Sequence, residues 1–171
     1  MIPAIGDRSL RLQHLVKTVA TSVTFQRLVG AESADEATGH IYEDLALDDD
    51  SEPLPRAIVR HQGPQTADRT GTTSFLGRGE MTVFIQYDDF TDEQLNGWYG
   101  LSGERTDRDR RRHMNNLYGQ ISAELRDVAT TAGCLEFQRL EEFSCGEVDP
   151  VTENGRKLIE LTWVIHREGL P

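Results

Sequence analysis

Cysteine is scarce in this sequence, which contains only Cys134 and Cys145. Two cysteines are too few for a disulfide framework, and these two do not form the Cys-x-x-Cys pair that is typical of redox and zinc sites. Cys145 also lacks the sequence setting that would make its thiol a nucleophile. We therefore expect both cysteines to be reduced, with at least one of them buried.

Long apolar runs are also missing. No stretch approaches the roughly 20 apolar residues that a transmembrane helix needs. Arg8 and Arg11 interrupt the apolar residues near the N-terminus, which argues against a signal peptide. These absences predict a protein that contacts no membrane and that is made and kept in the cytoplasm.

Metal-ligating patterns are absent as well. The histidines form no His-x-His or His-x-x-x-His pair; they are His14, His40, His61, His113 and His166. Asp48, Asp49, Asp50 and Glu52 could in principle bind a hard cation, but they lack the ligand spacing and central glycine of a calcium loop. We interpret them as a solvated acidic loop and expect no metal and no other cofactor.

Patterns that indicate catalysis are missing too. The chain has only two lysines, Lys17 and Lys157, and neither accompanies Asp88-Asp89 in the arrangement of a metal-dependent nuclease. Gly77-x-Gly79 lacks the third glycine, the lysine and the following helix of a phosphate-binding loop. The sequence therefore favours a protein that is not an enzyme.

Basic residues are outnumbered, with 18 Lys and Arg against 29 Asp and Glu, for a net charge of −11. Such a chain repels the phosphate backbone, which disfavours general nucleic-acid binding. Four arginines do cluster within Asp107–Arg112, but Asp107 and Asp109 interleave with them. We interpret this cluster as the salt-bridged start of a helix, with a nucleic-acid patch as the alternative.

The chain length of 171 residues fits a single domain covering residues 1–171. A domain of this size can bury about 70% of the surface of its unfolded chain, so it needs no disulfide or metal ion to fold. The apolar pattern first predicts a helix capped by Ser9 and reaching Val19 or Val23, a short turn of helix over Phe25–Leu28 ended by Gly30, and a short helix capped by Ser33 and ended by Gly39. It then predicts an extended piece at 40–42, a strand at 56–61, a long loop at 63–73, and a strand at 75–87 with a bulge or bend at Gly77 and Gly79. The rest of the chain is predicted to form a short helix from Thr91, a long helix from Asp107 to Gly133, a strand at 134–143 with a bulge near Arg139, a loop at 144–155 and a central strand at 157–167. We therefore expect an α+β fold, in which a four-stranded or slightly larger antiparallel or mixed sheet carries two main helices on one face.

Two segments favour contacts with partners. Phe90, Trp98 and Tyr99 place large aromatic side chains in a glycine-flanked stretch, and aromatic residues are enriched at protein interfaces. Whether they form an interface or fold back onto the core stays open at this point. The other segment is the predicted loop 63–73, where Thr72 and the adjoining Phe75 are candidate contact residues.

Five segments follow one another in a characteristic order, and together they cover about residues 10–168. They are Phe25–Gly30 at the end of the first helical region, the short piece His40–Tyr42, the proline-bearing link Pro53–Val59, the strand Glu80–Gln86 and the closing strand Ile159–Ile165. In this order they resemble the tail terminator (tail completion, minor tail) proteins of long-tailed bacteriophages and prophages. The chain departs from that family in a long 88–106 segment and in a long loop between its last two strands.

This resemblance implies a structural virion protein of the tail or neck, present in the host cytoplasm during assembly. Identical subunits, with six as the expected number, would form a ring that ends growth of the tail tube and joins the tail to the head. The implied partners are other copies of the chain, the tail-tube protein and a head–tail connector protein, while DNA only passes through the negatively charged lumen. The alternatives are a head-closure, neck or baseplate subunit of the same kind of virion, and a non-viral α+β ligand-binding module.

Overall fold

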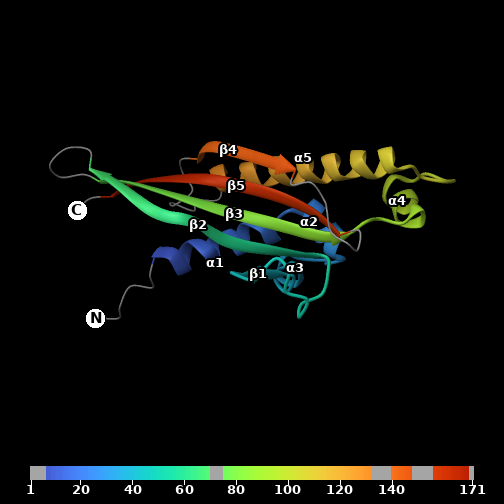
Figure 1. Cartoon of the computed structure of the whole chain (residues 1–171), viewed down its shortest axis with the longest axis horizontal. Coiled ribbons are helices and arrows are strands. Elements are labelled where there is room, and N and C mark those ends of the chain that lie inside the picture. Colours follow the sequence, from blue (N-terminus) through green and yellow to red (C-terminus); the bar gives the residue numbers. More distant parts are fainter. Residues whose placement is uncertain (1–6, 70–74, 132–139, 148–155, 170–171) are drawn as a thin grey trace.

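One five-stranded sheet organises the fold, with helices packed on one of its faces (Figure 1). The computed structural model describes residues 7–69, 75–131, 140–147 and 156–169. The elements in chain order are α1 (Asp7–Ala20), α2 (Val23–Val29), α3 (Ala34–Thr38), β1 (Ile41–Glu43), β2 (Arg56–Arg69), β3 (Phe75–Asp88), α4 (Asp92–Tyr99), α5 (Asp107–Thr131), β4 (Leu140–Glu147) and β5 (Arg156–Gly169). The strand order is β1-β2-β3-β5-β4, with β1 parallel to β2 and the other neighbours antiparallel. The predicted α+β class and mixed sheet are confirmed.

The three N-terminal helices follow local signals. Helix α1 covers Asp7–Ala20, so Ser9 lies inside the helix, and the prediction that Ser9 caps it is wrong. Ser22 caps α2 by accepting a hydrogen bond from the Phe25 amide, and Gly30 ends α2 in the left-handed conformation (φ 74°) that favours glycine. Ser33 caps α3 in the same way, as expected.

Strand β2 is longer than the sequence predicted. The segment 63–69, which we expected to be part of a loop, continues β2 and pairs with β3 as far as Arg69↔Phe75. Gly63 and Pro64 had indicated a loop, but they lie where the β2–β3 register shifts between Gln62 and Thr66. Proline is tolerated at such an irregularity in an outer strand, so here the turn signal marks a bulge.

Strand β3 lies at the centre of the sheet and pairs with β5 in unbroken register. On its other side the pairing with β2 shifts between Gln62↔Glu80 and Thr66↔Arg78, beside Gly79, so the ladder is irregular where we predicted a bulge or bend, but the extra residues belong to β2. Strand β4 covers residues 140–147, so residues 144–147 belong to a strand and not to the predicted loop. The β4–β5 register shifts between Leu140 and Glu142, close to the expected bulge at Arg139, which itself lies outside the described residues.

A single apolar core joins the helices to one face of the sheet. Its fully buried members come from α1, α2, β2, β3, α5 and β5 and include Leu15, Val19, Phe25, Val59, Ile85, Leu117, Ile121 and Leu161. Apolar residues from α1 and α5 meet those of three strands, which confirms the prediction of two main helices on one face. Glu124 of α5 adds a polar link, since its carboxylate accepts hydrogen bonds from the hydroxyls of Ser22 (2.6 Å) and Thr24 (2.8 Å) at the start of α2.

The opposite face of the sheet is covered in part by the acidic segment before β2. Arg56 is completely buried there and donates to the Gln86 side-chain oxygen (2.8 Å), the Glu52 carbonyl (2.9 Å) and the Leu47 carbonyl (3.4 Å). Gln86 donates in turn to the same Leu47 carbonyl (2.9 Å). The acidic loop predicted from composition is therefore held on the sheet by a buried guanidinium group.

Candidate functional site at the α4–α5 corner

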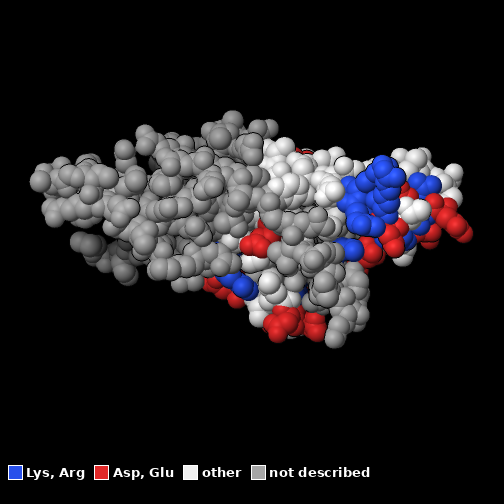
Figure 2. Space-filling model, turned by 45° about the horizontal axis from the view of Figure 1, so that its top comes forward, with Lys and Arg blue, Asp and Glu red and all other residues white. Residues whose placement is uncertain are grey.

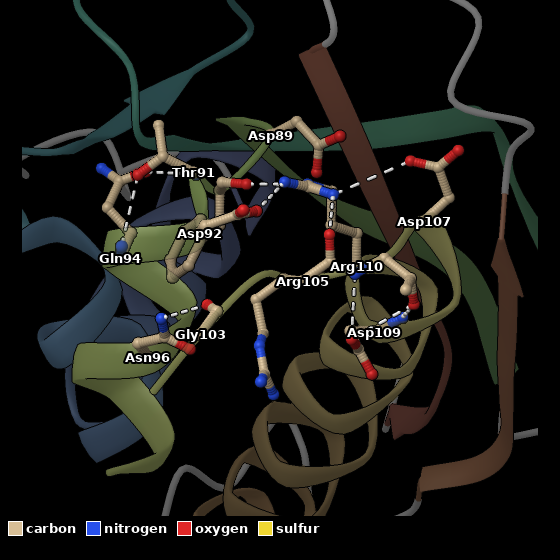
Figure 3. A network of polar contacts seen from close by, with 12 residues as sticks. Asp89, Thr91, Asp92, Gln94, Asn96, Gly103, Arg105, Asp107, Asp109 and Arg110 are labelled. Carbon is tan, nitrogen blue, oxygen red and sulfur yellow. Dashed lines mark hydrogen bonds and ion pairs between the residues drawn. The ribbon is translucent and has the colours of Figure 1, made fainter. Parts of the chain in front are cut away.

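Helix α4 begins and ends with well-formed caps. The Thr91 hydroxyl accepts from the Gln94 amide (3.2 Å), and the Gln94 side chain accepts from the Thr91 amide (2.9 Å), which together form a capping box. Gly100 ends the helix in the left-handed conformation (φ 66°). The Asn96 side-chain amide donates to the Gly103 carbonyl (2.8 Å), so the α4–α5 connection folds back against α4 (Figure 3). The short helix that we expected from Thr91 is confirmed.

Arg110 joins the starts of α4 and α5 (Figure 3). Its guanidinium group forms an ion pair with Asp92 (2.5 Å), donates to the Phe90 carbonyl (3.0 Å) and lies 3.7 Å from the Asp107 carboxylate. It also donates to the Arg105 carbonyl (3.4 Å). Arg110 is therefore a structural arginine, in agreement with the predicted salt-bridged helix start.

His113 of α5 lies at the centre of an aromatic cluster. Its ring centroid is 4.3 Å from that of Phe90, 5.3 Å from Trp98 and 5.5 Å from Tyr99. The side chain is only 1% exposed. The aromatic residues of α4 therefore pack around a histidine that the long helix contributes.

A chain of hydrogen bonds links this histidine to Tyr99 and Asn116. The Asn116 side-chain amide donates to the Tyr99 hydroxyl oxygen (3.1 Å), and this hydroxyl lies 2.7 Å from His113 Nδ1. The direction of the Tyr99–Nδ1 hydrogen bond depends on the histidine tautomer, and the buried Nε2 has no hydrogen-bond partner among the described residues. Burial and, to a smaller extent, the positive charge of Arg27 together lower the pKa of His113 to about 4. The imidazole is therefore neutral at neutral pH.

Arg27 ties α2 to the same corner. Its guanidinium carbon lies 3.9 Å from the centroid of the Trp98 ring, and its Nη2 donates to the Trp98 carbonyl (2.7 Å). This carbonyl belongs to the last turn of α4, where a positive charge is favoured by the helix dipole. The corner is thus attached to the core from two sides, by Arg27 and by His113.

A pocket of about 180 Å³ opens between α4 and α5. Its lining comes from the end of α4, the α4–α5 connection and one face of α5, and consists of Leu95, Tyr99, Leu101, Arg105, Asp109, Arg112, His113 and Asn116. Two arginines and one aspartate give this lining a net charge of about +1. A hydrogen bond from the Thr106 amide lowers the pKa of Asp109, and Arg105 and Arg112 contribute to the same shift. Arg105 Nε is buried and its N–H has no hydrogen-bond acceptor among the described residues.

The start of α5 carries exposed arginines, of which Arg112 lines this pocket. Arg108, Arg111 and Arg112 are exposed on α5, and within the described part of the chain none of them forms an ion pair. Figure 2 shows basic side chains gathered at the end of the molecule that carries α4 and the start of α5, with acidic side chains beside them. On a chain with a net charge of −11, this corner is a local positive feature. We call Arg105, Arg108, Arg111 and Arg112 the arginine corner.

The structure brings together three of the five candidate contact residues. Phe90 and Trp98 are half-buried and pack against the core, while Tyr99 is 38% exposed and lines the pocket. Phe75 is the first residue of β3, and its backbone pairs with Arg69 and Gly169. Thr72 lies outside the described residues. That these residues form an interface stays a prediction.

Sequence reasoning missed His113 and the pocket beside it. A usable signal existed for the histidine, because His113 stands four residues before Leu117 and continues the apolar stripe through Ile121 and Leu125. A polar residue in such a stripe is buried with a partner, which here is Tyr99. The pocket had no local signal, because Arg105 and Arg112 converge only after α4 has folded against α5.

No helix within the described ranges has the length and apolar character required to cross a bilayer. The described residues also contain no group of three histidine, cysteine, aspartate or glutamate side chains placed to hold a metal ion. No family model matches this chain, and no curated protein sequence matches it.

Proposed function

We propose that this chain is a structural subunit of a long-tailed phage or prophage particle, and that it assembles into a ring of the tail terminator kind. The observation that carries the proposal is the ladder formed by β2, β3 and β5. In Figure 1 the far end of this ladder extends past the described helices, so part of the sheet lies beyond the core that the helices build. A projecting ladder is suited to contacts with other subunits.

The dimensions of the ladder support such a role. Each of the three strands has 14 residues, which corresponds to about 45 Å at the usual rise per residue. In the half of the ladder whose side chains are described, the strands face the core through Ala57 and Val59 in β2, Val83 and Ile85 in β3, and Ile159 and Leu161 in β5. The other half continues as a paired backbone up to Arg69, Phe75 and Gly169.

The outer edge of β2 offers backbone groups for pairing. Strand β1 pairs with β2 only from Ala57 to Val59, and beyond Val59 no other described strand lies next to that edge. A sheet edge with unpaired amides and carbonyls is a template for strand addition by another chain. A contact between two different surfaces of identical subunits gives a finite particle only if it closes into a ring.

The order of the elements also supports the proposal. The proline-bearing link before Arg56 leads into β2, the segment Glu80–Gln86 lies in the central strand β3, and Ile159–Ile165 lies in β5 between two neighbours. These are the segments on which the resemblance to tail terminators rests. A ring of such subunits would end the tail tube and provide a surface for the head–tail connector.

Light scattering over a range of protein concentrations tests the proposal. We expect a monomer at low concentration and a single larger species of several subunits, six by our proposal, at high concentration. A twofold dimer as the only assembly would count against a ring. If the gene belongs to a phage or prophage, its deletion should give overlong tails in electron micrographs; tails of normal length without heads would instead indicate a head-closure role.

A further inference from the structure

We infer that the arginine corner of one subunit binds the acidic loop, residues 43–52, of a second copy of this chain. The inference rests on the proposed function and names the surfaces through which the ring would close. It is carried by the charge of the two surfaces, by the pocket at the centre of one of them and by their positions at opposite sides of the sheet.

The arginine corner has unused capacity to bind carboxylates. Arg112 lines the pocket, is exposed and has no ion pair to any described residue, whereas the Arg105 guanidinium is partly engaged by the Ser102 carbonyl (2.8 Å). Arg108 and Arg111 are exposed in the same first turns of α5 but do not line the pocket, and neither has an ion pair to any described residue. A guanidinium group binds a carboxylate through two parallel hydrogen bonds, so an acidic side chain is the natural occupant of this pocket.

The acidic loop carries a matching surplus of charge. Residues 43–52 contain six acidic residues and no basic residue; the acidic ones are Glu43, Asp44, Asp48, Asp49, Asp50 and Glu52. Asp48 is exposed, and the structure gives it no hydrogen bond or ion pair with a described residue. In Figure 2 an acidic patch lies apart from the basic end, on the side where Figure 1 draws β1 and α3.

The loop is ordered before any partner arrives. Arg56 donates to the carbonyls of Leu47 and Glu52, Gln86 donates to Leu47, and Arg60 donates to the Leu45 carbonyl. These bonds engage the loop backbone and leave the Asp48 carboxylate outside. Binding a pre-ordered loop costs less conformational entropy than binding a disordered one.

The two surfaces lie near opposite edges of the sheet. The acidic loop connects β1 to β2 at one edge, whereas α5 packs on β5 near the other edge. Both lie near the same end of the strands, since Arg56 begins β2 and α4 follows the end of β3. One subunit can therefore offer its arginine corner to one neighbour and its acidic loop to the other, which is the arrangement that a ring requires.

Charge reversal tests the inference through an alternating assembly. Arg112→Glu alone and Asp48→Arg alone should each lower the association constant by roughly 10–100-fold, because each places like charges opposite one another. An equimolar mixture should assemble again, since every interface in an alternating ring pairs either two native surfaces or two reversed ones. The double variant R112E/D48R should also assemble by itself. Lys17→Glu, on the exposed side of α1, is the control with the same charge change and should assemble as the wild type does.

The outcomes separate this inference from the proposed function. Rings of the wild type that form equally well with R112E and with D48R would overturn the inference and leave the ring proposal intact. A wild type that forms no larger species would overturn both. If inorganic phosphate or acetate stabilises the wild type but not R112E, and assembly is unaffected by the substitutions, the pocket serves a small anion and the inference is wrong.

Discussion

Acidification should destabilise this protein through His113, and the substitution His113→Phe should remove that contribution. The pKa of the buried imidazole is lowered from 6.5 to about 4, so between these values the unfolded chain binds a proton that the folded chain does not. The stability linked to this group is fully present above pH 6.5 and is lost as the pH falls towards 4. Phenylalanine keeps an aromatic ring next to Phe90 and Trp98 but cannot titrate.

The size of the effect follows from the two pKa values. Protonation of the unfolded chain alone lowers the free energy of unfolding by about 2 kcal/mol at pH 5 and by about 3 kcal/mol near pH 4. In a protein of this length, 2 kcal/mol corresponds to a decrease of about 4–8 °C in the melting temperature. The charged groups that face the site are Arg27 from α2, Arg105 from the connection, and Asp109 and Arg112 from α5. Arg27 and the two other arginines disfavour a charged imidazole, whereas Asp109 favours it.

Urea unfolding followed by circular dichroism between pH 7.5 and pH 4.5 measures this effect. The difference in unfolding free energy between the wild type and H113F should change by about 2.5 kcal/mol over this range, in favour of the variant at low pH. Titrating groups remote from the site, such as Asp49, contribute equally to both proteins and cancel in the difference. Parallel curves for the two proteins would refute the assignment of a neutral buried imidazole.

Three further predictions concern the fold and the edge of the sheet. Arg56→Met should lower the free energy of unfolding by about 3 kcal/mol in urea titrations, because Gln86 and two loop carbonyls lose a buried donor. Arg60 is only half-buried, so Arg60→Met should cost clearly less. Equal losses for the two variants would contradict the role of Arg56 as a buried donor. Glu124→Ala should cost about 2 kcal/mol in the same assay by removing the acceptor at the start of α2, with Glu124→Gln retaining part of the stability; a loss below 0.5 kcal/mol would show that the link is unimportant. His61→Pro should abolish assembly in light scattering yet leave the melting temperature within a few degrees, while His61→Ala should assemble normally. The last prediction follows from backbone direction: the Ala57 amide and the Val59 carbonyl both bond on the β1 side, so the His61 amide points to the same outer edge.

The fold could be predicted from the sequence wherever the signal was local and repeated. The apolar step of three or four residues through Met114, Leu117 and Ile121 defined α5, and alternation through Ile159 and Leu161 defined β5. Caps were predicted in part: Ser33 was identified and the helix after Thr91 was found, but Ser22 and Thr106 were missed and Ser9 was wrongly assigned as a cap. Segment 63–69 was mispredicted because Gly63 and Pro64 have the same local preferences in a turn and in a bulged outer strand, and only pairing with β3 decides between them.

The candidate site was far less accessible to sequence reasoning. Phe90, Trp98 and Tyr99 were recognised as unusual, but their common partner His113 lies on another helix. The same applies to Arg56, whose burial depends on Gln86 thirty residues later in the chain. Single-sequence patterns report on neighbours along one element, so contacts that form between elements leave little trace in them.

The most direct test of the central claim is negative-stain electron microscopy of the purified wild-type protein at high concentration. The account predicts closed rings of identical subunits with an open centre, which are lost in R112E alone and regained when R112E and D48R are mixed. Monomers or twofold dimers at every concentration would contradict it.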